Sequence, residues 1–385
     1  MAIKKLSIEE FLEKAERYPV FDVRSPGEFN HAQIPGAYSL PLFTDEERKV
    51  VGTAYKQQGR QKAIKPGLDF FGVKMKSMVE EVEKIVQSQH SLVQSQQSIV
   101  NGQQSFALQH SKNYTPAEPH EAKPPLGSLG VALVHCWRGG MRSAGVAWLL
   151  DLYGFEVYTL AGGYKAYRNW VLQQFEKEYD IKILGDYTGS GKTALLHQLK
   201  KCGQPMIDLE GLANHKGSAF GGIGLPPQPS PEMFENILAL QLNKTNGQSF
   251  WLEDESQRIG LLNIPNNFWK AMRTMPLFFV DVPFHERLKY IVKEYGELDK
   301  EKLGLSIERI QKRLGPLETK TALAHLFKGE IELCFGILLM YYDKQYKKAL
   351  DNRENIASLL NKIPCFSVDS ISNTEKLLLC TTVNS

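Results

Sequence analysis

Cys136 stands at the end of an apolar run and is followed directly by a loop of glycines and arginines. The run 131–135 predicts a short buried strand, and the residues from Ala144 onward predict an apolar helix. Glycines let backbone N–H groups turn inward, and the helix directs the positive end of its dipole to the same point. Because these fields lower the pKa of a thiol, we expect Cys136 to react as a thiolate. Such a thiolate can attack phosphorus, or it can carry sulfur or selenium.

The predicted anion cradle around this thiol comes from the loop and the first turn of the helix. Its members are Arg138, Gly139, Gly140, Arg142 and Ser143. The spacing from His135 and Cys136 to Arg142 also fits the pattern H-C-x-x-x-x-x-R of cysteine phosphatases. On this motif alone, a phosphatase stays open beside a chalcogen carrier.

A second glycine-rich segment occupies residues 185–193, between an apolar run at 181–184 and a predicted helix at 194–200. The order strand, loop and helix, with the ending Gly-Lys-Thr, predicts a phosphate-binding P-loop. Its predicted phosphate-binding residues are Thr188, Gly189, Ser190, Gly191, Lys192 and Thr193. We expect Lys192 to reach the outer phosphate oxygens and Thr193 to hold Mg²⁺. The usual pattern has glycine where this chain has Asp186, which argues more against rapid nucleotide hydrolysis than against phosphate binding.

Acidic residues follow another apolar run, at 250–252. A carboxylate at the end of a strand beside a P-loop can organise the metal ion, and Glu253 and Asp254 are the two candidates for this role. A purely structural turn is the alternative, so no metal ligand is firmly assigned.

Three further strings accompany the cysteine loop: D-V-R-x-P-x-E-F at 22–29, H-x-x-I-P-G-A at 31–37 and L-x-G-G-Y-x-A-Y-R at 160–168. In this order they resemble the rhodanese family, with which some phosphatases share the fold. A rhodanese-like part joined to a P-loop part, together with the runs at 207–221 and 253–260, resembles the tRNA 2-selenouridine synthase family.

The resemblance implies an enzyme that replaces sulfur by selenium at C2 of a modified wobble 2-thiouridine in tRNA, with selenophosphate as donor. It also implies S-geranylation of that thiouridine from geranyl diphosphate, which makes the sulfur a better leaving group. Cys136 matches the selenium-carrying residue of that family. The implied partners are the thiolated tRNA and an enzyme that supplies selenophosphate. A rhodanese-type sulfurtransferase or phosphatase with a regulatory nucleotide-binding domain is the alternative, as is a non-catalytic tRNA-binding protein.

We therefore predict an α/β chain in three parts. A rhodanese-like domain is expected at 1–177, a P-loop NTPase-like α/β domain at 178–298, and a mostly helical part that can bind tRNA at 299–385. A low-complexity insertion is expected at about 85–127, because residues 85–111 repeat a heptad rich in Gln and Ser without the spacing of a coiled coil. Strands of the P-loop domain are expected at 180–184, 205–209, 249–253 and 276–282.

The bulk composition sets the conditions for these functions. The 385 residues carry a net charge of only +3, so binding of tRNA requires a local basic patch. Candidate cations are Arg48, Lys49, Lys56, Arg60, Lys62 and Lys65, and, in the last third, Lys312, Arg313, Lys320, Lys344, Lys347 and Lys348; ordinary solvated helix faces are the alternative. Five scattered cysteines and no leader-like or membrane-spanning run lead us to expect a reducing, cytoplasmic location without a membrane partner.

Overall fold

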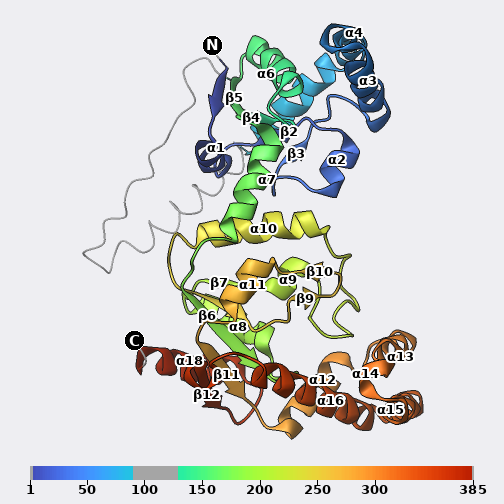
Figure 1. Cartoon of the computed structure of the whole chain (residues 1–385), viewed down its shortest axis with the longest axis vertical. Helices are drawn as coiled ribbons and strands as arrows, with labels where there is room; N and C mark the ends of the chain where they lie inside the picture. Colours follow the sequence, from blue (N-terminus) through green and yellow to red (C-terminus); the bar gives the residue numbers. More distant parts are fainter. Residues whose placement is uncertain (1–2, 90–128, 384–385) are drawn as a thin grey trace, which may run out of the picture. The chain divides into compact units, whose positions relative to one another are not determined.

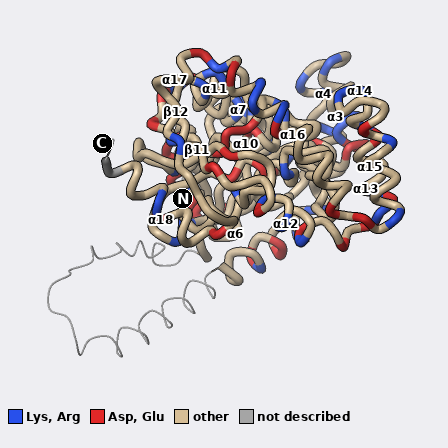
Figure 2. The backbone as a smooth tube through the Cα atoms, turned by 90° about the horizontal axis from the view of Figure 1, so that it is seen from below, with Lys and Arg blue, Asp and Glu red and all other residues tan. Residues whose placement is uncertain are grey.

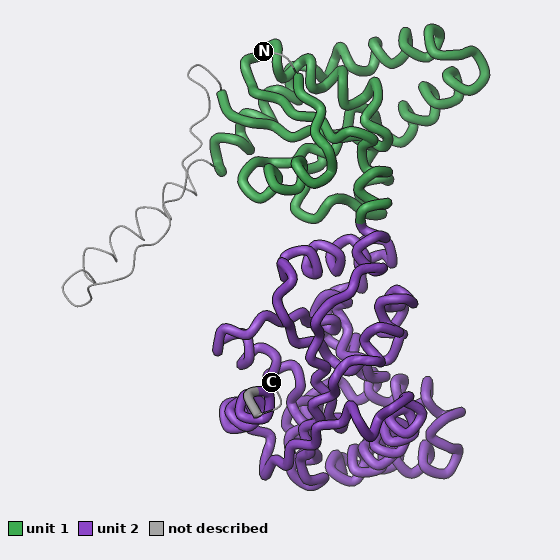
Figure 3. The backbone as a smooth tube through the Cα atoms, turned by 60° about the vertical axis from the view of Figure 1, so that its left-hand side comes forward, with its two compact units in different colours: residues 1–170 green, residues 171–385 purple. Residues whose placement is uncertain are grey.

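The computed structural model describes residues 3–89 and 129–383, which fall into two compact units (Figure 3). Unit 1 comprises residues 1–170 and unit 2 comprises residues 171–385. Each unit is built on its own five-stranded sheet with helices packed against it (Figure 1). Most of the predicted low-complexity insertion, residues 90–128, lies outside the described residues.

The sheet of unit 1 is parallel throughout and has the order β1-β5-β4-β2-β3. Its strands are β1 (Lys4–Leu6), β2 (Val20–Asp22), β3 (Tyr38–Ser39), β4 (Val131–His135) and β5 (Glu156–Leu160). The central strand β4 is buried at all five positions, as expected for a parallel strand covered on both faces. Cys136 follows this strand, so the cysteine loop leaves the middle of the sheet.

Helices of unit 1 connect these strands and cover the sheet. They are α1 (Ile8–Ala15), α2 (Pro26–His31), α3 (Asp45–Gln58), α4 (Arg60–Gly72), α6 (Met141–Tyr153) and α7 (Gly163–Gln174), the last of which continues into unit 2. Helix α2 begins with a capping box formed by Ser25 and Glu28, with Pro26 in the first turn. Helix α6 begins directly at the end of the cysteine loop.

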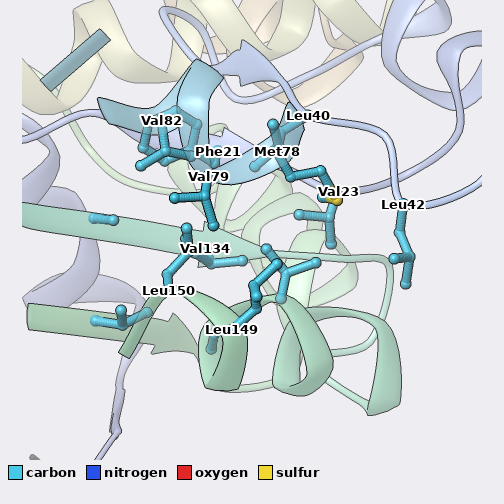
Figure 4. Close-up of a cluster of buried hydrophobic side chains, with 14 of the residues drawn as sticks. Phe21, Val23, Leu40, Leu42, Met78, Val79, Val82, Val134, Leu149 and Leu150 are labelled. Atoms are coloured by element: carbon cyan, nitrogen blue, oxygen red, sulfur yellow. The ribbon is translucent and has the colours of Figure 1, made fainter. Parts of the chain in front are cut away.

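The core of unit 1 also contains Val86, which we predicted to belong to the insertion. Figure 4 shows Val82, four residues earlier, in the same core. Residues 75–89 are helical, and Val82 and Val86 are 0% and 2% exposed. Two apolar residues four positions apart lie on the same face of a helix, and here that face packs into the core with Phe21 and Val134. The predicted insertion therefore starts too early, because residues 85–89 belong to the folded core.

The sheet of unit 2 is also parallel and has the order β12-β11-β6-β8-β7. Its strands are β6 (Ile181–Asp186), β7 (Met206–Ile207), β8 (Phe250–Glu253), β11 (Leu277–Asp281) and β12 (Leu360–Pro364); an antiparallel pair, β9 (Arg258–Ile259) and β10 (Leu262–Asn263), lies apart from it. The four predicted strands of this domain are confirmed as β6, β7, β8 and β11. Strand β12 was missed, because an edge strand can carry polar residues and a proline.

The helices of unit 2 include several from the last third of the chain. They are α8 (Lys192–Lys201), α9 (Leu209–Ala213), α10 (Pro231–Lys244), α11 (Asn266–Met272), α12 (Phe284–Tyr295), α13 (Lys300–Arg309), α14 (Gln311–Leu314), α15 (Pro316–Lys328), α16 (Ile331–Asp351), α17 (Ile356–Leu359) and α18 (Ser370–Val383). Leu377 of α18 packs with Leu196 of α8 in one hydrophobic core. Helix α18 therefore helps to cover the sheet of unit 2. None of the described helices is both long and apolar enough to cross a membrane.

Candidate functional site

The thiol of Cys136 is buried within its loop and is surrounded by hydrogen-bond donors. The backbone N–H of Gly140 donates to Sγ over 3.4 Å, and the hydroxyl oxygen of Ser143 lies 3.3 Å from Sγ. Burial raises the pKa of this thiol, but hydrogen bonds from Ser143 and the loop backbone, with the charge of Arg142, outweigh it and leave the pKa below its ordinary value. These contacts favour the thiolate, the reactive form.

The two glycines of the cysteine loop, Gly139 and Gly140, are needed for different reasons. Gly139 has φ of +62°, and a side chain there would approach the carbonyl oxygen of Leu160 to 2.6 Å. Gly140 has no neighbour that a methyl group would touch, and its N–H points at the sulfur. Arg138 is exposed beside them. Gly139 is thus required by packing, whereas Gly140 supplies a donor.

A second pair of glycines, Gly162 and Gly163, begins a segment that packs against the cysteine loop. Gly163 has φ of +62°, and a Cβ there would lie 2.3 Å from the carbonyl oxygen of Cys136. The next two residues donate backbone hydrogen bonds to the loop, from Tyr164 N to Cys136 O over 2.8 Å and from Lys165 N to Trp137 O over 3.0 Å. The string at 160–168 marked this segment in the sequence, but only the structure shows that it holds the loop in place.

Arg142 does not contact the sulfur directly. Its Nη1 donates to Oε2 of Glu28 over 2.9 Å, and Arg48 Nε lies 3.5 Å from the same oxygen. Burial raises the pKa of Glu28, yet the hydrogen bond and charge of Arg142 outweigh it, so the pKa is lowered and the group is a carboxylate. Glu28 thus holds two cations together beside the cysteine loop, a role that the sequence did not indicate.

A buried polar group lies beneath the loop. Asp22 accepts three side-chain hydrogen bonds from Arg24, whose guanidinium stacks 3.7 Å from the ring centre of Tyr164. Neither ring nitrogen of His135 has a hydrogen-bond partner within the described residues, and burial lowers its pKa despite Asp22 3.8 Å away. His135 is therefore held as a neutral imidazole, stacked against the ring of Tyr164.

The predicted phosphate loop lies between β6 and α8, in the middle of the sheet of unit 2. Gly189 and Gly191 have φ of +87° and +78°, so each needs a glycine. Ser190 closes the turn by donating to the carbonyl oxygen of Tyr187 over 2.8 Å. Arg287 of α12 holds the loop from outside, since its Nη1 donates to Thr188 O over 3.0 Å while both terminal nitrogens bind Asp343.

Lys192 is half-buried at the start of α8 and lies among carboxyl groups. Its Nζ is 2.9 Å from Glu255 Oε1 and 3.8 Å from Asp186 Oδ1. Burial opposes its charge, but Glu255 and Asp186 outweigh burial and raise its pKa, so Lys192 is an ammonium. Burial, with the nearby Glu255, raises the pKa of Asp186 to about 6. The carboxyl group at the usual glycine position therefore faces the lysine that should bind phosphate.

Two more carboxyl groups lie beside the phosphate loop. Thr193 Oγ1 donates to Glu210 Oε2 over 3.3 Å, and burial together with Glu255 raises the pKa of Glu210 to about 8. Glu253 ends β8; its Oε2 accepts from the N–H of Leu209 over 2.6 Å, while its buried Oε1 has no hydrogen-bond partner within the described residues. Thr193 and these two carboxyl groups are the donors that fit a Mg²⁺ ion. In the described part of the chain, no ready-made cluster of three His, Cys, Asp or Glu side chains holds a metal.

The second predicted metal-organising residue, Asp254, forms hydrogen bonds with residues of the last third of the chain instead. It accepts hydrogen bonds from Tyr346 over 2.7 Å and from Arg353 over 3.2 Å. The residue that reaches Lys192 is its neighbour Glu255, which the sequence analysis passed over. In the run Glu253-Asp254-Glu255, the two glutamates are associated with the phosphate loop and the aspartate with the helices of the last third.

Comparison with known proteins identifies the family to which the chain is similar. A family model described as the AAA domain of tRNA 2-selenouridine synthase matches residues 179–362, which lie within unit 2. A solved domain from Clostridium difficile 630 is 31% identical over 44% of this chain and 99% of its own length, with a TM-score of 0.31, and is a likeness in sequence only.

Three relatives are described as tRNA 2-selenouridine synthase. The protein of Nitrosomonas europaea is 33% identical over 72% of this chain, but the match covers only 63% of that protein. The protein of Sulfurovum sp. is 34% identical over 77% of this chain and 76% of its own length. The protein of Bdellovibrio bacteriovorus is 32% identical over 88% of this chain and 90% of its own length. On this coverage, the chain belongs to the tRNA 2-selenouridine synthase family.

Proposed function

We propose that this chain is a tRNA-modifying transferase that makes 2-selenouridine from a wobble 2-thiouridine. One observation carries the proposal: an activated thiol, Cys136, lies in an N–H-lined loop in a chain that also contains a phosphate loop around Lys192. A protein that only binds nucleotide or RNA has no use for a thiol held in the thiolate form. The names of the relatives supply the substrate, and a reducing cytoplasm suits the free thiol.

Unit 1, with the rhodanese-like strings, is proposed to handle selenium. Selenophosphate is a small tetrahedral anion, and the nearby cation Arg142 can attract it to the thiolate that the Gly140 N–H and Ser143 stabilise. The Cys136 thiolate attacks selenium, the selenium–phosphorus bond breaks and its electron pair leaves on phosphorus as phosphite, so that Cys136 carries the selenium as a selenopersulfide. After the outer selenium has bonded to C2 of the uridine, a small-molecule thiol of the reducing cytoplasm attacks the Cys136 sulfur. The electron pair of the sulfur–selenium bond then stays on selenium, which gives 2-selenouridine and a mixed disulfide that a second thiol reduces. The exposed Arg138 stands at the mouth of the same loop, where an incoming anion would pass.

Unit 2 is proposed to carry out S-geranylation with geranyl diphosphate. The thiocarbonyl sulfur attacks the first carbon of the geranyl group, the carbon–oxygen bond breaks and diphosphate leaves with the electron pair. Lys192 and the backbone N–H groups of residues 188–193 stabilise the charge that develops on the diphosphate. A Mg²⁺ ion held by Thr193 and the carboxyl groups of Glu210 and Glu253 would add further positive charge at this position. The S-alkylated uridine then loses geranyl thiolate when selenium attacks C2.

The test uses the full-length protein with a tRNA that carries wobble 2-thiouridine. Purified protein, selenophosphate and geranyl diphosphate are combined, and the nucleosides are separated and weighed by mass spectrometry. We expect S-geranylated uridine when selenophosphate is omitted and 2-selenouridine when both donors are present. Turnover of thiosulfate or of a phosphopeptide, without either tRNA product, would instead support the sulfurtransferase or phosphatase alternative.

A further inference from the structure

Helices α3 and α4 form a hairpin in unit 1, and a long stretch of this hairpin carries cations without acids. From residue 48 to residue 68 the chain contains no Asp or Glu. The cations of this stretch are all exposed: Arg48, Lys49, Lys56, Arg60, Lys62 and Lys65. Figure 2 shows the blue segments on α3 and α4. The acids of α3 are confined to its first turn, at 45–47.

The spacing along α3 places cations and an aromatic ring on adjoining rows of one face. Residues seven apart lie on the same side of a helix, which pairs Arg48 with Tyr55 and Lys49 with Lys56. Tyr55 is 51% exposed, although a tyrosine ring usually gains from burial. At about 1.5 Å per residue, these rows run for about 12 Å along the helix. Such a face suits a chain of phosphates with unstacked bases.

The basic face begins at the cysteine loop. Arg48, at the root of the hairpin, lies 3.5 Å from Glu28 Oε2, the same oxygen that accepts from Arg142 over 2.9 Å. Arg142 belongs to the first turn of α6, which directly follows the loop of Cys136. The carboxylate of Glu28 therefore links Arg48, at the root of the hairpin, to Arg142 beside the cysteine loop.

The cations of the last third differ from these. Lys312 and Arg313 lie between Glu308 and Glu318 in the sequence, and the run 344–348 is flanked by acids at 343 and 351. These acid-free stretches are shorter than the one at 48–68, so the flanking acids lie closer to the cations and lower the positive potential, as is typical of solvated helix faces.

We propose that the basic hairpin, defined as residues 48–65, is the surface by which unit 1 binds the phosphate backbone of tRNA and leads the thiouridine to Cys136. This inference rests on the proposed function for the identity of the polyanion. Of the two groups of candidate cations in the sequence, it selects the one at 48–65 and not the one in the last third, to which we had partly assigned the binding of tRNA. Phosphate contacts position a nucleic acid without reading its sequence, so the base itself is left free to enter the cysteine loop.

The experiment removes charge from the hairpin and measures tRNA binding against salt. The full-length variant Lys56→Gln/Arg60→Gln/Lys62→Gln/Lys65→Gln leaves Arg48 and the cysteine loop unchanged. We expect its dissociation constant for the thiolated tRNA to rise at least tenfold at low salt. The slope of log affinity against log salt concentration should fall by about 3 to 4, since each lost phosphate contact removes roughly one unit.

A matched variant removes four exposed lysines from unit 2: Lys200→Gln/Lys201→Gln/Lys244→Gln/Lys270→Gln. It should keep the parent's slope to within about one unit. Both variants are checked for an unchanged melting temperature and an unchanged rate of Cys136 alkylation. The inference is overturned if the hairpin variant keeps the parent's affinity and slope, or if the unit 2 variant loses as much.

Binding and product formation separate this inference from the proposed function. If the parent makes 2-selenouridine and the hairpin variant still binds normally, the hairpin is excluded while the function stands. If the parent makes neither tRNA product but the slope still falls with the hairpin charges, the surface is supported and the proposed function fails.

Discussion

The cysteine loop and the phosphate loop have the same strand–loop–helix arrangement, but the protein places a charge of opposite sign in each. Each follows the central region of a parallel sheet and leads into the first turn of a helix, α6 or α8. In the cysteine loop the protein supplies its own anion, because the N–H of Gly140 points at Cys136 Sγ. In the phosphate loop the protein supplies a cation, Lys192, and surrounds it with carboxyl groups.

This difference shows how each loop meets an incoming anion. A thiolate already satisfies the donors of the cysteine loop, so an anion arriving there adds to a negative group and needs further cations nearby. In the proposed function, a diphosphate that binds the phosphate loop has to compete with Glu255 and Asp186 for Lys192. Protonation of one of these carboxyl groups reduces the repulsion between the acids and a bound diphosphate. The raised pKa values of Asp186 and Glu210 favour such protonation.

The largest effect should come from the cysteine itself. Cys136→Ala should abolish formation of 2-selenouridine while S-geranylation stays within about twofold of the parent, because only the first reaction needs a chalcogen carrier. Mass spectrometry of the wobble nucleoside measures both products in one reaction. Normal selenation by this variant would show that the carrier assignment is wrong, and a loss of both products would show that the two loops do not act separately.

Lys192→Ala tests the other loop. Losing one fixed positive group at a leaving diphosphate should slow geranylation by about 100- to 1,000-fold, the effect of about 2.7–4 kcal/mol seen for single oxyanion donors. Selenation of tRNA that is already S-geranylated should change little, and this substrate serves as the control. Equal rates of geranylation by the variant and the parent would exclude a diphosphate role for the phosphate loop.

Two glycines of unit 1 separate packing from chemistry. Gly163→Ala should lower the free energy of unfolding by about 2 kcal/mol or more, because the added Cβ meets Cys136 O at 2.3 Å with φ at +62°. Gly140→Ala is the matched control; it has φ of −103° and open space, so its cost should stay below about 1 kcal/mol. Urea unfolding measures both. Similar losses for the two variants would mean that the contact between the two glycine loops does not hold the cysteine loop.

The carboxyl groups around Lys192 predict a pH dependence for unit 2. The pKa of Glu210 is raised from 4.5 to about 8 on folding, so the stability that comes with its protonated form is present at low pH and is lost as the pH rises through this window. Glu210→Gln imitates the protonated form. The variant should therefore gain stability over the parent between pH 5 and pH 8, by on the order of 1–3 kcal/mol. Unfolding curves at both pH values measure this gain; a constant difference between the two proteins would contradict it.

Local patterns predicted the parts of both loops that are continuous in the chain. The glycines, Cys136, Lys192 and the flanking strands and helices could be identified because each loop uses neighbouring residues and special backbone angles. What the sequence did not indicate depends on strand order. Glu255 reaches Lys192 only because β8 pairs with β6.

Long-range contacts limited the predictions in unit 1 as well. The pair Glu28 and Arg142 joins residues 114 positions apart, and no spacing rule connects them. The repeat 85–111 appeared polar and self-similar, which hid the apolar face that Val86 shares with Val82. An amphipathic helix that is continued into a repeat looks like part of the repeat until its partner surface is known.

The smallest effect should come from deleting residues 90–111. We expect both reactions and the melting temperature to stay near the parent's, because a Gln- and Ser-rich segment buries little apolar surface and loop length changes stability only slowly, by about 0.6 kcal/mol per doubling. The matched deletion of residues 85–111 should behave differently, since it removes Val86, which is 2% exposed, and so opens the core of unit 1. Measuring the two deletions side by side for melting temperature, tRNA affinity and selenation separates the core helix from the repeat. If the shorter deletion alone weakens tRNA binding while the fold stays intact, the repeat is a binding element. The two loops would then depend on a third segment of the chain to bind the tRNA.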